Sequence, residues 1–359
     1  MNINNQRREE SNYENQNLAA SNLNCLIENE VERLLIISDT HFGDETQLLD
    51  NRKRVDKFAE AVSSIGEIDE FVLLGDILDL WVKTPMPALR CARYFIEKIT
   101  SLDAVKKFIY VPGNHDHQMF MNAFRLEMDM SIMQGKLKTP KFMPARAYGD
   151  TVLSGIDSRA GENFPMVYPY IVRIMNGRKV VLAHGHHLDF YATKGGWFRT
   201  FWLSRFIMKR RRAKVTLHDI EMANIPFCGA MSVMPWVPEL VIEGLKFYHL
   251  LSFFARIFRS EKMLKSPLRD SLIRENYDEI KGLLPLFEQP DADCFVFGHT
   301  HRPGIGRIPD MDVLIANCGC WTVGNEDNVP NETWLVIDRS VRLYELSDKE
   351  PKILSEDYL

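Results

Sequence analysis

Short runs of apolar residues, each ending in a polar turn, recur along the chain and predict buried β-strands. Five runs are followed directly by acidic, amide or histidine side chains: Arg33–Ser38, Phe71–Leu74, Phe108–Val111, Lys179–Ala183 and Cys294–Phe297. Residues 52–64 and 86–100 separate the first three runs and have the apolar spacing of helices. This alternation of strand and helix predicts a layered α/β protein.

After about residue 150 the predicted strands follow one another without long helices between them. These strands are Thr151–Ser154, Tyr170–Ile174, Lys179–Ala183, Val313–Ala316 and Thr333–Ile337. Asn176-Gly177 lies between two of them and is a strong signal for a two-residue hairpin.

The pattern divides the chain into four parts. Residues 1–30 contain nine Asn and few apolar side chains, so they are predicted to form a disordered tail. Residues 31–189 and 276–359 carry the strands and are predicted to form one core in two pieces. Residues 190–275 interrupt the strand pattern and are predicted to form a helical, lid-like insertion.

Composition narrows the class of protein only slightly. A net charge of −5 gives no overall bias toward nucleic acid, and 45% apolar residues allow a large core. Six scattered cysteines without paired CxxC motifs favour a reducing, cytoplasmic setting. The sequence opens without the apolar core of a signal peptide and contains no charge-free apolar run of about 18 residues, so no transmembrane helix is predicted.

Histidines concentrate at the polar turns. Eight of the ten lie at or beside these five turns, and only His218 and His249 lie elsewhere. The side chains at the turns are Asp39, His41, Asp76, Asp79, Asn114, His115, Asp116, His184, His299 and His301. Because imidazole and carboxylate are mixed, the set favours Zn²⁺, Mn²⁺ or iron over Mg²⁺ or Ca²⁺. It is too large for one tetrahedral ion and suits two ions that share a carboxylate.

The order of these blocks, D-x-H, G-D-x-x-D, G-N-H-D, H-G and G-H-T-H, resembles the calcineurin-like metallophosphoesterase superfamily. All five blocks are present between residues 39 and 301. The resemblance implies a four-layer α/β/β/α sandwich, with a helical insertion near the active face, and two divalent metal ions, Mn²⁺ before Fe or Zn²⁺. One ion would be held by Asp39, His41, Asp76 and His301. The other would be held by Asp76, Asn114, His184 and His299, with Asp76 bridging the pair.

The same resemblance implies a mechanism. Two ions about 3.5–4 Å apart can share a water and lower its pKa toward ~7, which gives hydroxide for in-line attack on a phosphoryl group. His115 would protonate the leaving oxygen as general acid, although it could instead only bond a backbone group. Asp116, with Asp79, would orient the ligands or His115. His117, His186 and His187 are expected at the rim of the site or facing solvent, and Cys320 is expected to be structural.

Within the superfamily, Gly75–Trp81 and Gly298–Pro303 resemble the UDP-2,3-diacylglucosamine diphosphatase branch. Leu80-Trp81 stands where Ser/Thr protein phosphatases carry Arg-Gly, which disfavours a phosphoprotein substrate. The chain departs from the diphosphatase pattern at His115, where that branch usually has Arg, and at His186, where it usually has Asp. The implied function is hydrolysis of a phosphodiester or pyrophosphate bond in a nucleotide-sugar or lipid-linked substrate. The alternatives are a nuclease of the same superfamily and a non-catalytic scaffold.

The insertion opens with a basic, aromatic stretch. Residues 194–214 contain eight basic side chains and no acidic ones, with Trp and Phe at helical i,i+4 spacing. Such a helix is typical of a peripheral contact with an anionic membrane surface. Equally, its aromatic side chains could pack against the core while the charges face water. Nucleic acid, engaged by Arg210–Arg212, ranks below both.

Overall fold

The computed structural model describes the core strands and their helices. The residues described are 28–135, 164–190, 216–221, 225, 228–229, 276–323, 329–347 and 350–359, together with the backbone of 146–150. The predicted strand 151–154 and the basic stretch 194–214 lie outside these residues. The boundaries predicted for the insertion and for the two core pieces stay predictions.

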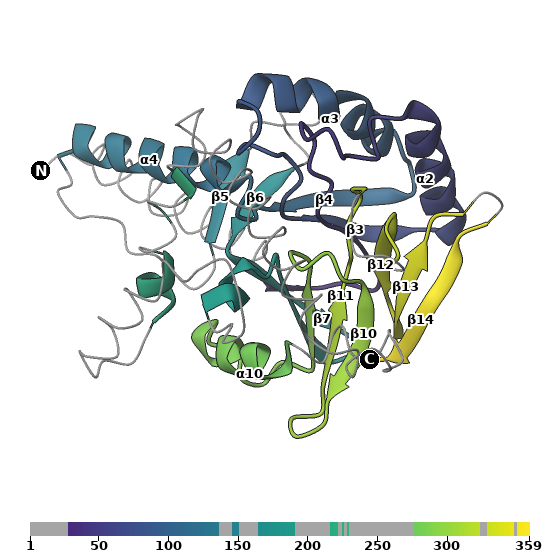
Figure 1. Cartoon of the computed structure of the whole chain (residues 1–359). Coiled ribbons are helices and arrows are strands. Elements are labelled where there is room, and N and C mark those ends of the chain that lie inside the picture. The colour runs from purple at the N-terminus through teal and green to yellow at the C-terminus, as the bar shows by residue number, and fades with distance from the viewer. Residues whose placement is uncertain are drawn as a thin grey trace, which may run out of the picture.

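Two mixed β-sheets form the centre of the molecule (Figure 1). In spatial order, one sheet consists of β14 (Lys352–Tyr358), β13 (Ser340–Glu345), β12 (Thr333–Ile337), β2 (Leu34–Ile37), β3 (Ile68–Leu74), β4 (Val105–Val111), β6 (Pro165–Tyr168) and β5 (Arg146–Asp150). The other consists of β1 (Glu28–Glu30), β7 (Tyr170–Met175), β8 (Arg178–Ala183), β9 (Cys294–Phe297), β11 (Val313–Asn317) and β10 (Gly304–Ile308).

Three apolar cores hold four layers together. Helices α2 (Arg52–Ile65) and α3 (Pro85–Thr100) cover the outer face of the larger sheet, where Phe58 packs on Phe71 and Phe95. The inner faces of the two sheets bury aliphatic side chains between them. Helix α10 (Tyr277–Leu286) covers the outer face of the smaller sheet, opposite α2 and α3 in Figure 1. The predicted α/β/β/α sandwich is confirmed.

Strand register brings the polar turns to one edge. Strands β2, β3 and β4 run parallel, with Ile37 beside Leu73 and Leu74 beside Val111. In the other sheet β8 and β9 are also parallel, with Leu182 beside Val296. Because parallel strands end at the same edge, the segments that follow all five strands meet there.

The sequence prediction is wrong at the end of the tail. Residues Glu28–Glu30 form β1, which pairs in parallel with Val172–Ile174 of β7. An edge strand needs only backbone hydrogen bonds on one side, so it forms without the apolar run used to recognise the other strands. Residues 1–27 lie outside the described residues. The helix α4 (His117–Met133) was not anticipated either.

The hairpin between β7 and β8 is confirmed. Asn176 and Gly177 both have positive φ, 52° and 76°, as a type I′ turn requires. In the described part of the chain, every helix is too short or too polar to cross a lipid bilayer.

One ion pair is buried between the sheets. Arg173 of β7 donates from Nε to Glu70 Oε2 of β3 at 2.5 Å, and both side chains are almost fully buried. Lys107 approaches the other oxygen of Glu70 at 3.2 Å. The guanidinium cannot lose its proton, so it depends on this carboxylate for compensation.

Glu70→Leu is expected to lower the free energy of unfolding by about 3–5 kcal/mol, because it removes the carboxylate that balances the buried Arg173 guanidinium. Urea denaturation measures the change. The double variant Glu70→Leu with Arg173→Met removes both charges and should be clearly more stable than Glu70→Leu alone. Equal losses in the single and double variants would show that the charge pair is not the cause.

Candidate dinuclear metal centre

The segments after β2, β3, β4, β8 and β9 place nearly all the predicted side chains in one cluster. Within the described residues, three groups there have donor atoms close enough to share an ion. They are Asp39, His41 and His301; Asp76, His184 and His299; and His41, Asp76 and His115. All seven of these residues belong to the set that the sequence predicts at the polar turns.

The backbone is strained where the ligands sit. Asp39, His41, Asp76, His299 and His301 have positive φ, between 48° and 62°. Residues other than glycine seldom adopt this conformation, and such strain concentrates at functional sites. Each of these backbones therefore turns sharply to direct its side chain into the cluster.

Two glycines make room for the carboxylates. A Cβ on Gly113 would lie 2.3 Å from Asp76 Oδ1, and one on Gly298 would lie 2.3 Å from Asp39 Oδ2. Both separations are far below van der Waals contact, so these turns tolerate only glycine. Glycine in the third and fifth motif blocks thus has a physical reason in this fold.

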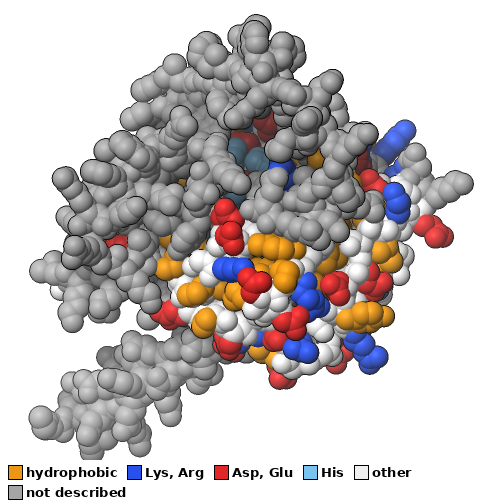
Figure 2. Space-filling model, turned by 60° about the horizontal axis from the view of Figure 1, so that its bottom comes forward, with side chains coloured by type: hydrophobic (Ala, Val, Ile, Leu, Met, Phe, Trp, Pro, Cys, Tyr) orange, Lys and Arg blue, Asp and Glu red, His pale blue; other side chains and the backbone are white. Residues whose placement is uncertain are grey.

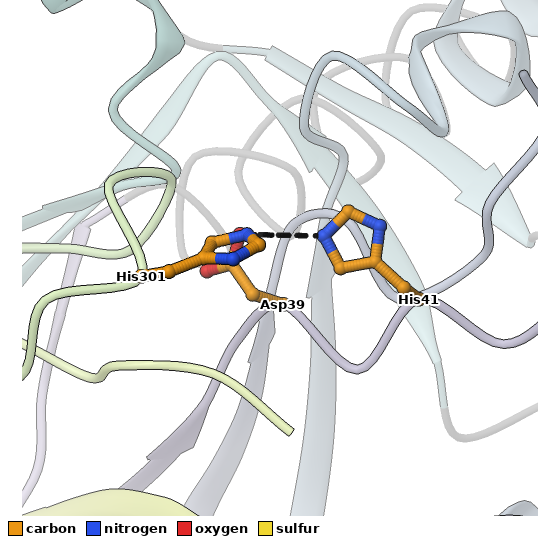
Figure 3. A group of neighbouring side chains, drawn as sticks. All are labelled: Asp39, His41 and His301. Atoms are coloured by element: carbon orange, nitrogen blue, oxygen red, sulfur yellow. Dashed lines mark hydrogen bonds and ion pairs between the residues drawn. The ribbon is translucent and has the colours of Figure 1, made fainter. Parts of the chain in front are cut away.

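The first group points three donor atoms at a common place (Figure 3). His301 Nε2 lies 3.2 Å from His41 Nε2 and 3.2 Å from Asp39 Oδ1. Asp39 Oδ2 accepts hydrogen bonds from Ser38 Oγ at 2.5 Å and from the His299 amide at 2.9 Å. Asp39 Oδ1 is buried and makes no well-aligned hydrogen bond. One oxygen is thus fixed by the protein while the other is directed toward a cation position.

The second group is built around Asp76. His184 Nε2 lies 3.1 Å from Asp76 Oδ2 and 3.2 Å from the side-chain oxygen of Asn114. His184 Nδ1 lies 3.0 Å from the carbonyl of Leu74, which selects the tautomer whose Nε2 lone pair faces the cluster. Asp76 Oδ2 is also 3.9 Å from His41 Nε2 of the first group. This carboxylate therefore lies between the two groups, as a bridging ligand must.

His115 lies at the open side of the cluster. Its side chain is 22% exposed and that of His301 is 30% exposed, whereas those of His41 and His184 are buried. Its Nδ1 lies 3.0 Å from Asp79 Oδ2, and its ring stacks on Trp81 with centroids 3.9 Å apart. Asp79 also contacts His41 Nδ1 at 3.0 Å, so one carboxylate orients both imidazoles.

Asp116 is fully buried and supports the loops from below. Its oxygens accept from Tyr110 at 2.6 Å, from the Gly113 amide at 2.5 Å and from the Ile77 amide at 2.8 Å. These contacts connect the turns after β3 and β4. Asp116 is therefore a positioning residue, which fits the orienting role expected for it.

The charges of the cluster are tightly balanced. Burial would raise the pKa of Asp39 and Asp76, but the positive charge of His184 holds both below the ordinary value. Burial would lower the pKa of His184 and His301, but the carboxylates raise them to about 9 and about 10. Without metal, these imidazoles hold protons at neutral pH. Protons and divalent cations thus compete for the same nitrogen atoms.

Burial would lower the pKa of His41 as well, but Asp39, Asp79 and Asp76 raise it well above the ordinary value. Metal binding near pH 7.5 is therefore expected to release about three protons per chain, from His41, His184 and His301. Calorimetric titration with Mn²⁺ in buffers of different ionisation enthalpy measures the number, and affinity should fall as pH falls. The stability of the metal-free fold depends on pH in the opposite direction. The raised pKa values of His184 and His301 stabilise this fold fully below about pH 6.5, and the stabilisation is lost as pH rises through about 9 and 10. Heats that do not depend on the buffer would contradict the assignment of these histidines as ligands.

The expected rim positions of three histidines are wrong. His117, His186 and His187 are buried, with exposures of 0%, 7% and 0%. Glu221, from the region of the predicted insertion, lies against His187 and covers them. Cys320 is also buried and lies beside His301, and its expected structural role stays a prediction.

Several contributing residues carried too little signal in the sequence. Ser38, Trp81 and Tyr110 bond or stack on the predicted side chains, but nothing in their spacing distinguishes them from core residues. Glu221 is the acidic residue that sequence reasoning missed. In Figure 2, histidine side chains lie beside acidic ones in one area, while the remaining described surface mixes charged and apolar side chains.

The family is established by sequence. The family of calcineurin-like phosphoesterases matches residues 32–303, and the chain belongs to this family. Membership implies a hydrolase in general terms and a dinuclear metal centre, for which the two groups around Asp39 and Asp76 have suitable donors. Comparison with curated proteins found no match.

Several solved structures are similar in fold. A dimetal phosphatase from Danio rerio is 10% identical, with a TM-score of 0.41, covering 91% of this chain and 99% of that one. A metallophosphoesterase from Sphaerobacter thermophilus is 15% identical, with a TM-score of 0.31 and coverages of 91% and 89%. Vps29 from Entamoeba histolytica, complexed with Zn²⁺, is 11% identical, with a TM-score of 0.35 and coverages of 91% and 98%.

Proposed function

We propose that this chain is a metal-dependent phosphoesterase that hydrolyses a phosphodiester or pyrophosphate bond of a nucleotide-sugar or lipid-linked substrate. The observation that carries the proposal is the position of Asp76. Its carboxylate lies within reach of His184 on one side and His41 on the other. The flanking groups each offer one carboxylate and two imidazoles. This donor chemistry suits Mn²⁺, iron or Zn²⁺.

The contacts indicate a separate role for each residue of the site. When bound, two cations would activate a water and offset the charge that develops on the phosphoryl oxygens. Asp39, His41, Asp76, Asn114, His184, His299 and His301 would hold them. His115 would donate a proton to the leaving oxygen, because its ring is partly exposed beside the cluster and lies outside the two groups around Asp39 and Asp76. Asp79 and Trp81 fix its ring from two sides, which reduces the freedom it loses in the reaction.

The apolar residues beside His115, Leu80 and Trp81, favour a substrate whose phosphoryl group carries one negative charge fewer than a phosphate monoester. Leu80 is buried and Trp81 stacks on His115 at the place where protein phosphatases of this superfamily carry Arg-Gly. An apolar, aromatic wall does not neutralise a second phosphate charge. A diester or pyrophosphate also carries an organic group that the indole can contact. The sugar nucleotide and the lipid are proposed from the resemblance of Gly75–Trp81 and Gly298–Pro303 to the diphosphatase branch.

The test is hydrolysis by chelator-treated protein reloaded with Mn²⁺, Fe²⁺ or Zn²⁺. We expect bis-p-nitrophenyl phosphate to be cleaved faster than p-nitrophenyl phosphate, and only after reloading. UDP-diacylglucosamine and single-stranded DNA are then compared at equal phosphate concentration. Preference for DNA would replace the proposal with a nuclease. Metal binding without turnover of any ester would indicate a scaffold.

A further inference from the structure

A second histidine cluster lies beside the dinuclear centre, and neither metal group uses it. It consists of His117 at the start of α4, His186 and His187 in the short helix η2 (His186–Phe190), and Glu221. Glu221 comes from residues 216–221, inside the predicted insertion. All four side chains are buried, at 7% exposure or less.

The donor atoms of this cluster converge. One donor atom each of His186, His187 and Glu221 lie within 4.8 Å of one another. His187 Nε2 lies 2.5 Å from Glu221 Oε1, and His117 Nε2 lies 3.5 Å from Glu221 Oε2. The Tyr168 hydroxyl lies 3.0 and 2.9 Å from the two Glu221 oxygens and 3.2 Å from His186 Nε2.

As a hydrogen-bond network the cluster is incomplete. Four buried nitrogen atoms have no hydrogen-bond partner: both of His117, Nδ1 of His186 and Nδ1 of His187. Every neutral imidazole has one donor and one acceptor nitrogen, and leaving such a group unsatisfied costs about 1–3 kcal/mol. Three imidazoles also face one carboxylate, so the cluster offers more buried nitrogen atoms than Glu221 can bond. A bound ion reduces this cost, because it takes up one lone pair of each imidazole while Glu221 balances part of its charge.

We propose that His117, His186, His187 and Glu221 bind a third metal ion, Zn²⁺ by donor chemistry, that fastens residues 216–221 to the phosphoesterase core. Three imidazoles and one carboxylate form a complete tetrahedral set for Zn²⁺. Tyr168 would orient Glu221 from outside the coordination sphere.

This site is separate from the dinuclear centre but adjacent to it. The His186 ring lies 5.7 Å from that of His184 and 6.5 Å from that of His299, centroid to centroid. A structural ion here would link the insertion directly to the loops that carry two catalytic-metal ligands. Its occupancy does not depend on the reaction catalysed, so it can be tested without a substrate.

The decisive measurement is anomalous diffraction at the zinc edge from full-length protein crystallised with Zn²⁺ and Mn²⁺. We expect a zinc peak between His187 and Glu221, in addition to the dinuclear pair. Metal analysis after exhaustive dialysis should give about three ions per chain. Glu221→Gln and His187→Gln should each lose one ion, while Glu45→Gln, an exposed control, should lose none.

A water-filled cluster without an anomalous peak would overturn the proposal, as would variants that keep the wild-type ion count. The diffraction experiment uses the unaltered protein, so it tests the proposal even if a variant fails to fold. Thermal unfolding with and without Zn²⁺ supplies a second readout. Zn²⁺ should raise the melting temperature of the wild type above that of Glu221→Gln, at equal Mn²⁺ loading.

Discussion

Asp76→Asn is expected to reduce the metal content from two ions in the dinuclear centre to fewer than one, and kcat/KM by about 10³-fold, or about 4 kcal/mol. The amide has the same shape but no charge, so it cannot bridge two cations. Asp76 Oδ1 accepts a hydrogen bond from the His115 amide at 2.8 Å. Gly113 packs so closely against Asp76 that a side chain larger than Asp or Asn would not fit. The substitution therefore removes the bridge while altering the packing little.

The comparison with Asp39→Asn makes this prediction specific. Asp39 belongs to one metal group only, so the Asp39→Asn variant should retain the ion held by His184 and His299. Metal analysis and hydrolysis of bis-p-nitrophenyl phosphate are measured on both variants and on Asp103→Asn, an exposed control. If both site variants lose the same number of ions, Asp76 is not the bridging residue.

That the residues of the candidate metal centre lie together could be predicted, because they follow simple strands. Each apolar run ends at a turn, and parallel register places the turns at one edge regardless of their distance along the chain. His184 and His299 are far apart in sequence, yet they follow the neighbouring strands β8 and β9. Residue type and strand order are therefore sufficient to predict which side chains meet, without any knowledge of their geometry.

The second histidine cluster could not be predicted in the same way. Glu221 lies 34 residues beyond His187, in a stretch where the sequence predicts no strand to fix its position. Burial of His117 depends on the unanticipated α4 and on Tyr168, whose ring packs 5.4 Å from it. Turn chemistry suggested exposed histidines, and tertiary packing buried them.

The side chains that orient the ligands were also hidden from sequence reasoning. Trp81 contacts His115 through ring stacking, which leaves no periodic pattern in the sequence. Positive φ at Asp39, His41 and Asp76 could not be predicted from the sequence either, because Asp and His adopt it more often than most residues but still only in a minority of positions. Strain at the site is compensated by the buried strands on which each turn is built.

His115→Gln should leave both ions of the dinuclear centre bound and slow the hydrolysis of alkyl phosphodiesters by about 10²–10⁴-fold. Alkoxide is a poor leaving group that needs a proton, whereas p-nitrophenolate leaves without one. Esters of p-nitrophenol should consequently lose less than about tenfold. The ratio between the two substrates separates proton donation from a general disturbance of the site.

The structure leaves His115 a second role, because its donor atom also lies near those of His41 and Asp76. As a metal ligand, it would lower ion content when replaced, and both substrate classes would slow equally. Metal analysis of His115→Gln beside His218→Gln, an exposed histidine outside the centre, distinguishes the two. We expect unchanged metal content, because Asp79 fixes the Nδ1 side of the ring and the stacked indole holds its plane beside the cluster. The imidazole is thereby held where a departing oxygen needs a proton.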